Sequence, residues 1–252
     1  MTSGGDCTRL FGRDICLVED PDLSQLVSVM DQKPCASVFF CNVHMLMLSQ
    51  EDPILAAAMD SADFVFADGV PISWLQKRVT NSTAKTVWGW QLMEAVCRYA
   101  VNNGQAIGLI GSTPEVMAAL VENLETRFEG LSISFRYSPP YSPGELLSTK
   151  EELQSINSAS PSWLFVGLGC PKQEKWVNRY KSDLNCKVLA VGAAFDWLAE
   201  TSKKPPDWME KRGLAWLFRL LQNPRKMWHR YLIYNTKFVI KSAGLLLKKD
   251  RY

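Results

Sequence analysis

The stretch Trp163-Leu-Phe-Val-Gly-Leu-Gly-Cys-Pro-Lys-Gln-Glu174 determines how the rest of the chain is interpreted. Four apolar residues are followed by two glycines and then by Pro171, which is the order expected of a buried strand, a tight turn and the first turn of a helix. Other short apolar runs have a similar strand-forming composition, and they lie at residues 37–41, 64–66, 106–110, 132–137 and 188–191. These runs are predicted to be the strands of the fold.

Segments with helical character separate the predicted strands. They cover residues 45–60, 91–101, 114–128 and 151–158, and another begins near Pro171. Strands that are linked by helices pair in parallel, because a parallel link needs a long crossover. We expect an α/β fold, a Rossmann-like parallel sheet with helices on both faces, which binds its ligands at the carboxyl ends of the strands.

The composition limits the chemistry that is available. The chain has 252 residues, 47% of them hydrophobic, which is enough for one core with an appendage. Its 7 cysteines contain no C-x-x-C pair, which favours reduced thiols in the cytosol over a disulfide framework or a zinc site. With only 2 histidines, we expect no metal site, and no cofactor is predicted. Residues 1–14 lack a signal-peptide pattern and no apolar run reaches about 18–20 residues, so a soluble or peripheral protein is expected.

The charge is distributed unevenly. Residues 203–252 contain 13 Lys or Arg and 3 Asp or Glu, a net charge of +10, which leaves −8 for residues 1–202. We call residues 1–202 the body and residues 203–252 the C-terminal segment. The C-terminal segment shows no strand pattern and interleaves Trp and Tyr with its basic residues, so we expect a basic helical appendage. Its dense aromatics favour an anionic membrane surface over nucleic acid, with ordinary packing on the body as the alternative.

Asp68 directly follows the predicted strand at residues 64–66 and precedes Gly69. A carboxylate at this edge of the sheet could remove the proton of a hydroxyl nucleophile. It could equally cap the helix that begins near Pro71. The spacing does not decide between a catalytic base and a helix cap.

Two glycine-containing turns are candidates for binding an anion. Gly111 follows one strand, and Gly167 and Gly169 follow another. Glycines let backbone N–H groups approach a phosphate at the start of a helix, but they also suit an ordinary tight turn. Neither turn has the G-x-G-x-x-G pattern and the chain has no G-x-x-x-x-G-K-[ST], which excludes the dinucleotide-binding and P-loop classes.

Polar residues near these turns are further candidates. The amide of Gln173 could bind a uracil or a sugar hydroxyl, whereas Glu174 also suits the first turn of a helix. His44 follows a strand, where an isolated histidine is often structural. Asp196 could cap a helix or contact a ribose.

Taken together and in order, these motifs resemble the WecG/TagA/CpsF family of glycosyltransferases. The matching stretches span residues 36–232, and the most specific are Ala67-Asp-Gly-Val-Pro71 and Gly169-Cys-Pro-Lys-Gln-Glu174. The others are Asn42-Val-His44, Gly89-Trp-Gln-Leu-Met93, Leu109-Ile-Gly111, Val191-Gly-Ala-Ala-Phe-Asp196 and Gly213-Leu-Ala-Trp-Leu-Phe-Arg219, with Arg225, Arg230 and Tyr231 beyond them.

The resemblance implies an inverting, metal-independent transfer of an N-acetylmannosamine-, N-acetylmannosaminuronate- or hexose-type sugar. The donor would be a UDP-sugar and the acceptor a polyprenyl-diphosphate-linked saccharide in cell-surface polysaccharide synthesis. Asp68 is then the expected general base, and Arg219, Arg225 and Arg230 are expected to bind a diphosphate. The expected substrate-binding residues are Asn42, His44, Lys85, Gly111, Gly167, Gly169, Gln173, Glu174, Phe195 and Asp196.

The resemblance also implies that the C-terminal segment docks on the membrane at its cytoplasmic face. Its aromatics could instead serve a subunit interface, which leaves a homo-oligomer open. The chain departs from common family residues at Phe40, Thr86, Glu200 and Ala215. The first two departures motivate an alternative, a catalytically inactive nucleotide-sugar sensor or scaffold at the membrane. A peripheral adaptor that acts through its basic segment alone is a further alternative.

Overall fold

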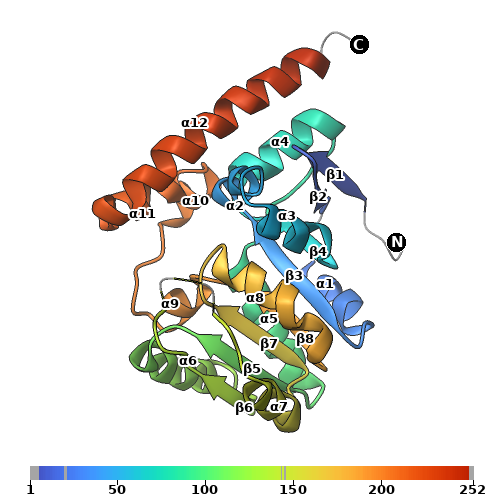
Figure 1. Cartoon of the computed structure of the whole chain (residues 1–252), viewed down its shortest axis with the longest axis vertical. Coiled ribbons are helices and arrows are strands. Elements are labelled where there is room, and N and C mark those ends of the chain that lie inside the picture. The colour runs from blue at the N-terminus through green and yellow to red at the C-terminus, as the bar shows by residue number, and fades with distance from the viewer. Residues whose placement is uncertain (1–5, 20–21, 143, 145, 250–252) are drawn as a thin grey trace.

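An eight-stranded sheet forms the centre of the computed structural model, which describes residues 6–19, 22–142, 144 and 146–249 (Figure 1). The strands lie in the order β1-β2-β4-β3-β8-β7-β5-β6. Strands β1 and β2 are antiparallel, and the other neighbouring pairs are parallel. Their bounds are β1 (Cys7–Leu10), β2 (Arg13–Cys16), β3 (Ala36–Cys41), β4 (Phe64–Ala67), β5 (Ala106–Gly111), β6 (Ser132–Tyr137), β7 (Trp163–Gly167) and β8 (Lys187–Ala190). The carboxyl ends of the parallel strands therefore share one edge of the sheet.

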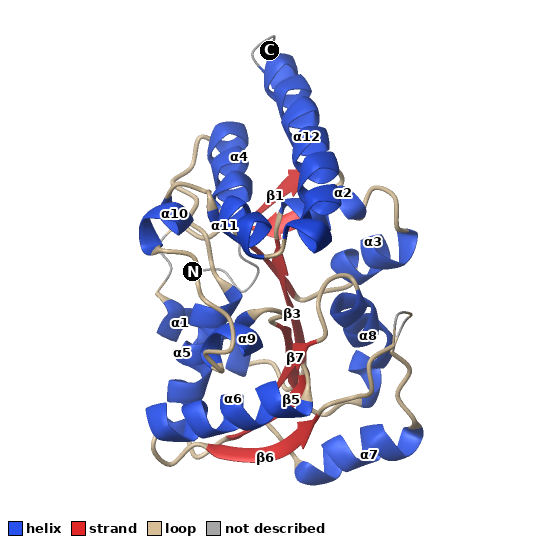
Figure 2. Ribbon diagram, turned by 90° about the vertical axis from the view of Figure 1, so that its left-hand side faces the viewer, coloured by secondary structure: helices blue, strands red, loops and turns tan. Residues whose placement is uncertain are grey.

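Helices cover both faces of the sheet, as Figure 2 shows. One face carries α1 (Leu23–Asp31), α5 (Gly89–Asn102), α6 (Pro114–Arg127) and α9 (Ala194–Leu198). The other carries α2 (Val43–Leu48), α3 (Pro53–Asp60), α7 (Lys150–Ala159), α8 (Lys172–Tyr180) and the short 3-10 helix η1 (Lys181–Asp183). Helix α4 (Val70–Thr80) follows β4 and packs against β1 and β4. This arrangement confirms the predicted α/β fold class.

The residues of β3 alternate between two apolar cores. Val38 and Phe40 pack in the core beneath α5 and α6, whereas Phe39 and Cys41 pack in the core beneath α2 and α8. Every residue of β3 is buried. Burial on both faces explains why the strands appear in the sequence as continuous apolar runs and not as an alternation of apolar and polar residues.

The predicted strands are confirmed, with ends that differ by at most one residue from those observed. The single helix predicted over residues 45–60 is wrong, because the chain forms α2 and α3 there. Pro53 has no N–H to continue a helix, and the carboxylate of Asp52 accepts the N–H groups of Ile54 and Leu55 at 3.1 and 3.0 Å. A new helix therefore begins at Pro53.

The hairpin of β1 and β2 and the following helix α1 are missing from the sequence-based prediction. Each strand of the hairpin has only four residues. The turn between them consists of Phe11 and Gly12, with φ of 47° and 83°. A two-residue turn of this kind usually contains Asn-Gly or Asp-Gly, so the phenylalanine conceals the hairpin signal.

The C-terminal segment forms three helices, α10 (Asp207–Lys211), α11 (Ala215–Gln222) and α12 (Pro224–Lys249). The long helix α12 crosses one end of the molecule, where it packs against α2 and α4, and α11 packs against α12 (Figure 1). Phe238 of α12 is buried in the core beneath α2, and its ring meets that of Phe11 at 6.3 Å. In the described part of the chain, none of the helices combines the length and apolar character that crossing a membrane requires.

We expect Gly167→Ala to destabilise the fold. A Cβ atom at Gly167 would lie 2.6 Å from the ring of Phe195, which is only 1% exposed and has no room to move. The free energy of unfolding, measured in urea, should fall by about 1–3 kcal/mol. Gly244→Ala in α12 is the matched control, because its Cβ atom would meet open space and helix propensity should raise stability by up to about 1 kcal/mol. Equal effects of the two substitutions would contradict the close packing at Gly167.

Candidate active site

A cavity of about 310 Å³ lies at the carboxyl ends of β3 and β4, between the body and the C-terminal segment. Both parts of the chain supply its walls. The body contributes Asn42, His44, Asp68, Gly69, Trp88 and Trp197, among others, and the C-terminal segment contributes residues that include Glu210, Trp216, Arg219, Tyr231, Asn235 and Phe238. The described C-terminal helices thus form a wall of the cavity.

Asp68 is placed in this cavity by the end of β4. Its N–H donates to the carbonyl of Cys41 at 2.9 Å, which joins the ends of β4 and β3. The next residue, Gly69, is the N-cap of α4 with φ of 95°, and no side chain caps that helix. The interpretation of Asp68 as a helix cap is therefore wrong, and its half-buried carboxylate lines the cavity.

Asn42 has two roles at the end of β3. Its Oδ1 accepts the N–H of Met45 at 3.2 Å and caps α2. This bond fixes the amide so that Nδ2 faces Oδ2 of Asp68 at 3.5 Å. The cap of α2 therefore orients a hydrogen-bond donor toward the candidate base.

The buried thiol of Cys41 lies close to two carboxylates. Complete burial, together with the negative charges of Asp68 and Glu174, raises the pKa of Cys41 well above its ordinary value. Cys41 therefore stays a neutral thiol. The shared neighbour also shows that Glu174, at the start of α8, lies near the end of β4 that carries Asp68.

Arg219, which belongs to α11, is a cationic residue in the wall of the cavity. Its guanidinium lies 4.6 Å from the ring centre of Trp197 in α9, a cation–π contact between the C-terminal segment and the body. A second contact between the two parts joins His44 and Tyr234, whose rings meet edge to face at 4.7 Å. Aromatic contacts thus hold the basic helices against the cavity.

The glycine turns at the ends of β5 and β7 pack against each other. A Cβ atom at Gly111 would lie 2.5 Å from the carbonyl oxygen of Gly167. Gly111 and Gly169 have φ of 130° and 81°, and the N–H of Ser112 donates to Gly167 at 3.2 Å. Phe195 packs on Gly167 from α9. These turns form a second group of predicted site residues, outside the lining of the cavity around Asp68.

Gln173 links residues of the second group through hydrogen bonds. Its Oε1 accepts the N–H of Gly169 at 3.0 Å, and its Nε2 donates to Glu174 at 2.8 Å and to the carbonyl of Ala190 at 2.9 Å. The side chain is only 5% exposed. Both amide hydrogens are used inside the protein, so the geometry favours a role for Gln173 in holding the turn after β7 against the end of β8.

Other predicted residues lie away from the cavity wall. Lys85 is exposed, and its backbone N–H donates to Val18. Asp196 is half-buried in α9, and Arg225 is exposed at the start of α12. None of these three lines the cavity. The side chain of Arg230 lies outside the described residues.

The two departures from the family pattern that prompted a sensor hypothesis occupy packing positions. Phe40 contacts Gly89, where an added Cβ atom would lie 3.3 Å from its ring, and it packs on Phe66 at 6.3 Å. The hydroxyl of Thr86 is hydrogen-bonded to that of Ser73 at 2.9 Å in the interior. Neither residue lines the cavity.

Several cavity residues have no site role predicted from the sequence, although Tyr231 is among the residues that carry the family resemblance. Tyr231, Asn235 and Phe238 follow one another at helical spacing, a pattern that also predicts ordinary packing or a lipid-facing surface. Glu210 lines the cavity and is only 8% exposed. The sequence feature that could have pointed to Glu210 is its acidic side chain within a strongly basic segment.

Metal ligands do not gather among the described residues, where no group of three or more His, Cys, Asp and Glu side chains is arranged to hold an ion. An Asp-x-Asp triplet is a metal-binding pattern, and the sequence contains one at residues 20–22. Asp22 caps α1 by accepting the N–H groups of Ser24 and Gln25, and residues 20–21 lie outside the described part of the chain.

The fold and the cavity define an α/β enzyme-like protein with its site at the carboxyl edge of a parallel sheet. The family model described as "Glycosyl transferase WecG/TagA/CpsF family" matches residues 9–252, so the chain belongs to this family. It is a glycosyltransferase of the hexosyl or N-acetylhexosaminyl type. The resemblance seen in the sequence is thereby confirmed.

Three relatives share the enzyme name N-acetylglucosaminyldiphosphoundecaprenol N-acetyl-beta-D-mannosaminyltransferase. A relative from Bacillus spizizenii is 26% identical over 238 residues, which cover 92% of this chain and 88% of the relative. A relative from Bacillus subtilis is 26% identical over 223 residues, covering 88% and 83%. A relative from Staphylococcus aureus is 29% identical over 194 residues, covering 77% and 74%.

We expect Asn42→Asp to lower sugar transfer without unfolding the protein. The new carboxylate still caps α2, so the free energy of unfolding should stay within about 1 kcal/mol of wild type. It also removes the donor that faces Asp68 and adds a negative charge beside it. Asp68 then holds its proton more tightly, and the acid limb of the pH–rate profile should move to higher pH.

Asn42→Ala is the control for this prediction. It removes the same donor without adding charge, at a cost of about 1 kcal/mol for the lost cap. Its acid limb should therefore move less than that of Asn42→Asp. Identical profiles in wild type and Asn42→Asp would show that Asn42 does not act on the group that titrates.

Proposed function

We propose that this enzyme transfers an N-acetylmannosamine-, N-acetylmannosaminuronate- or hexose-type sugar from UDP to a polyprenyl-diphosphate-linked saccharide in cell-surface polysaccharide synthesis. The observation that carries the proposal is the position of Asp68, whose carboxylate lines the cavity and does not cap α4. The relatives named above support the acceptor class, since their names specify a sugar on diphosphoundecaprenol.

The proposed reaction is a direct displacement with inversion. Asp68 takes the proton of the acceptor hydroxyl, the hydroxyl oxygen bonds to the anomeric carbon of the donor, and the bond from that carbon to UDP breaks. Negative charge then develops on the leaving diphosphate. Arg219 on the cavity wall offsets charge of this kind without a metal ion, and a guanidinium suits phosphate oxygens geometrically.

The glycine turns are the proposed donor site. Gly111, Gly167 and Gly169 bring the backbone at the carboxyl edge close together, and a side chain at either Gly111 or Gly167 would collide with its neighbours. Glu174, which adjoins this group, lies near the buried Cys41 beside Asp68. A UDP-sugar that lies along the turns would direct its sugar toward the cavity, where Asp68 and the acceptor meet.

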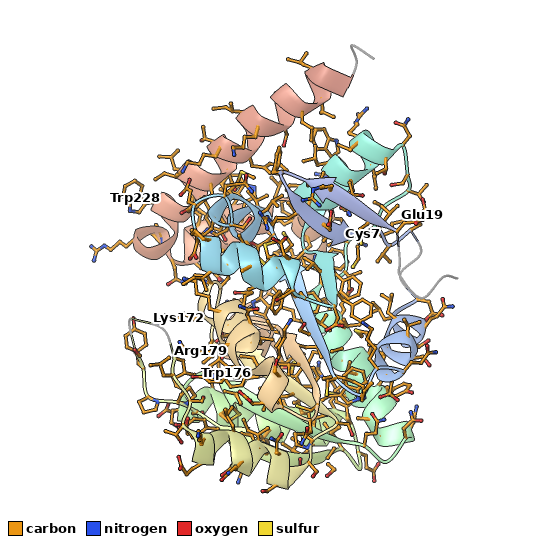
Figure 3. All side chains as sticks on the ribbon, turned by 45° about the vertical axis from the view of Figure 1, so that its right-hand side comes forward. Cys7, Glu19, Lys172, Trp176, Arg179 and Trp228 are labelled. Atoms are coloured by element: carbon orange, nitrogen blue, oxygen red, sulfur yellow. The ribbon has the colours of Figure 1, made fainter. Side chains whose placement is uncertain are left out.

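The C-terminal segment is the proposed membrane-associating part, acting at the cytoplasmic face, and the body is the proposed catalytic part. Trp228, Leu232 and Val239 are spaced by four and seven residues, so they lie on one side of α12. They are 54%, 64% and 64% exposed, and Trp228 projects away from the body (Figure 3). An apolar stripe in a basic helical segment suits an anionic lipid surface, which is where a polyprenyl acceptor is found.

The transfer reaction can be tested by measuring UDP release. Purified protein is incubated with a panel of UDP-sugars and a lipid-diphosphate-GlcNAc acceptor in detergent, beside Asp68→Asn. We expect release that requires the acceptor and falls by about 100-fold or more in Asp68→Asn, which is the usual contribution of a general base.

The other outcomes of this assay are equally informative. UDP binding without release across the panel would favour the sensor or scaffold alternative. Release that is unchanged in Asp68→Asn would leave the transferase assignment in place and would rule out Asp68 as the base.

The membrane proposal can be tested with Leu232→Glu combined with Val239→Glu. Each charge removes an apolar contact with lipid, so binding to vesicles of phosphatidylglycerol and phosphatidylcholine should fall by about tenfold or more. Leu147→Glu is the matched control, because Leu147 is a 62% exposed leucine on the body. Equal vesicle binding by the double variant and the control would contradict a lipid contact through this face of α12.

A further inference from the structure

Cys7 and Cys16 face each other across the N-terminal hairpin, at the edge of the sheet remote from the glycine turns. They are directly opposite partners in the register of β1 and β2. Figure 3 labels Cys7 on β1, the outermost strand. Both are thiols in the structure, Cys7 exposed and Cys16 half-buried.

The hydrogen-bond pattern of the hairpin brings these two cysteines close. The N–H of Leu17 donates to the carbonyl of Asp6 at 2.7 Å, so Asp6 and Leu17 form a hydrogen-bonded pair. Pairs alternate along an antiparallel ladder, which makes Cys7 and Cys16 a non-hydrogen-bonded pair with Cα atoms about 4.5 Å apart. Disulfides span Cα separations of about 4.4–6.8 Å, so the backbone does not have to move for the two sulfurs to bond.

The next non-hydrogen-bonded pair along the hairpin shows that side chains meet on this face. Arg9 and Asp14 lie two residues further along each strand, and they form an ion pair at 3.1 Å. Cys7 and Cys16 also shift each other's pKa, as neighbouring thiols do. The register therefore places the two thiols opposite each other on a face of the hairpin where side chains meet.

The two thiols differ in reactivity. The hydrogen bond from Cys16 lowers the pKa of Cys7 to about 7, whereas the same bond and burial raise the pKa of Cys16 above its ordinary value. An exposed thiolate beside a protonated, more buried thiol is the arrangement of an attacking and a resolving cysteine.

We propose that Cys7 and Cys16 form a redox modification site that exchanges with low-molecular-weight disulfides and closes an internal disulfide. The Cys7 thiolate attacks one sulfur of the small disulfide, forms a mixed disulfide and releases one thiolate. The Cys16 thiol then loses its proton and attacks the Cys7 sulfur, which releases the second thiolate. Two protein thiols are oxidised to one disulfide, and the small disulfide is reduced to two thiols.

The disulfide between Cys7 and Cys16 would constrain the hairpin of β1 and β2, whose turn contacts the C-terminal segment. Strand β1 pairs only with β2 among the described strands, so a disulfide would secure the open end of the hairpin. At the other end, Phe11 meets Phe238 of α12, and its carbonyl accepts a hydrogen bond from Gln50 at 2.7 Å. Oxidation should therefore stabilise a hairpin whose tip supports α12, and this does not depend on the proposed function.

The site can be tested by incubating the full chain with oxidised glutathione and then blocking the remaining thiols with an alkylating reagent. We expect wild type to lose two thiols, and tryptic cleavage after Arg9 and Arg13 should leave two peptides joined by a disulfide. Cys16→Ser should instead retain glutathione on Cys7, and Cys7→Ser should leave Cys16 reduced. The disulfide-linked form should unfold at a higher temperature than the reduced form.

Cys35→Ser is the matched control, because Cys35 is another exposed thiol that the tryptic peptide of Cys16 also carries. The internal disulfide should persist in this variant. A second measurement on wild type alone is binding of phenylarsine oxide, which needs two adjacent thiols. Wild type that keeps glutathione on Cys7 while Cys16 is alkylated, or that fails to bind phenylarsine oxide, would overturn the proposal.

Discussion

The close approach of the backbone at the carboxyl edge of the sheet is the constraint on which the site depends. The ends of β5 and β7 leave no room for a Cβ atom at Gly111, and Phe195 fills the space beside Gly167. Gln173 then links the turn after β7 to the end of β8 through hydrogen bonds to Gly169 and Ala190. Because α8 starts from the turn after β7 and α9 follows the end of β8, the same contacts fix the positions of Glu174 and Trp197 relative to the cavity.

A second level of organisation comes from the contact between the body and the C-terminal segment. The body supplies the carboxylate of Asp68 and the amide that faces it, whereas the C-terminal segment supplies the guanidinium of Arg219. The proposed base and the proposed diphosphate-binding cation therefore come from different parts of the chain. The contact of Arg219 with Trp197 and that of Tyr234 with His44 keep the two sets of groups together.

Much of the sheet could be predicted from the sequence because its strands are buried on both faces and therefore stand out as apolar runs. The position of Asp68 at a strand end was equally visible, but its role was not, since a helix cap has the same local pattern. The structure excludes the helix-cap interpretation through Gly69, which occupies the cap position. The hairpin of β1 and β2 stayed hidden because its turn uses Phe11, which lacks the usual turn chemistry.

Residues of the C-terminal segment were harder to assign for a different physical reason. A helix of basic and aromatic residues has the same composition whether its aromatics face lipid, a core or a ligand. In this chain α12 has two different faces, with Tyr231 and Phe238 buried and Leu232 and Val239 exposed. Only the packing partners of the helix, supplied by α2 and α4, distinguish its faces.

The cavity wall formed by α11 and α12 has a consequence for side reactions. A carboxylate base in open solvent activates water as readily as it activates a sugar hydroxyl, and the result would be hydrolysis of the donor. Aromatic and aliphatic side chains of the C-terminal segment line the same cavity as Asp68, so the proposed base would meet less water there than in open solvent. In the proposed reaction, the helix that offers an apolar face to the outside would also shield the reacting groups from water, so that binding of a lipid-linked acceptor and protection of the donor would be linked in a single structural element.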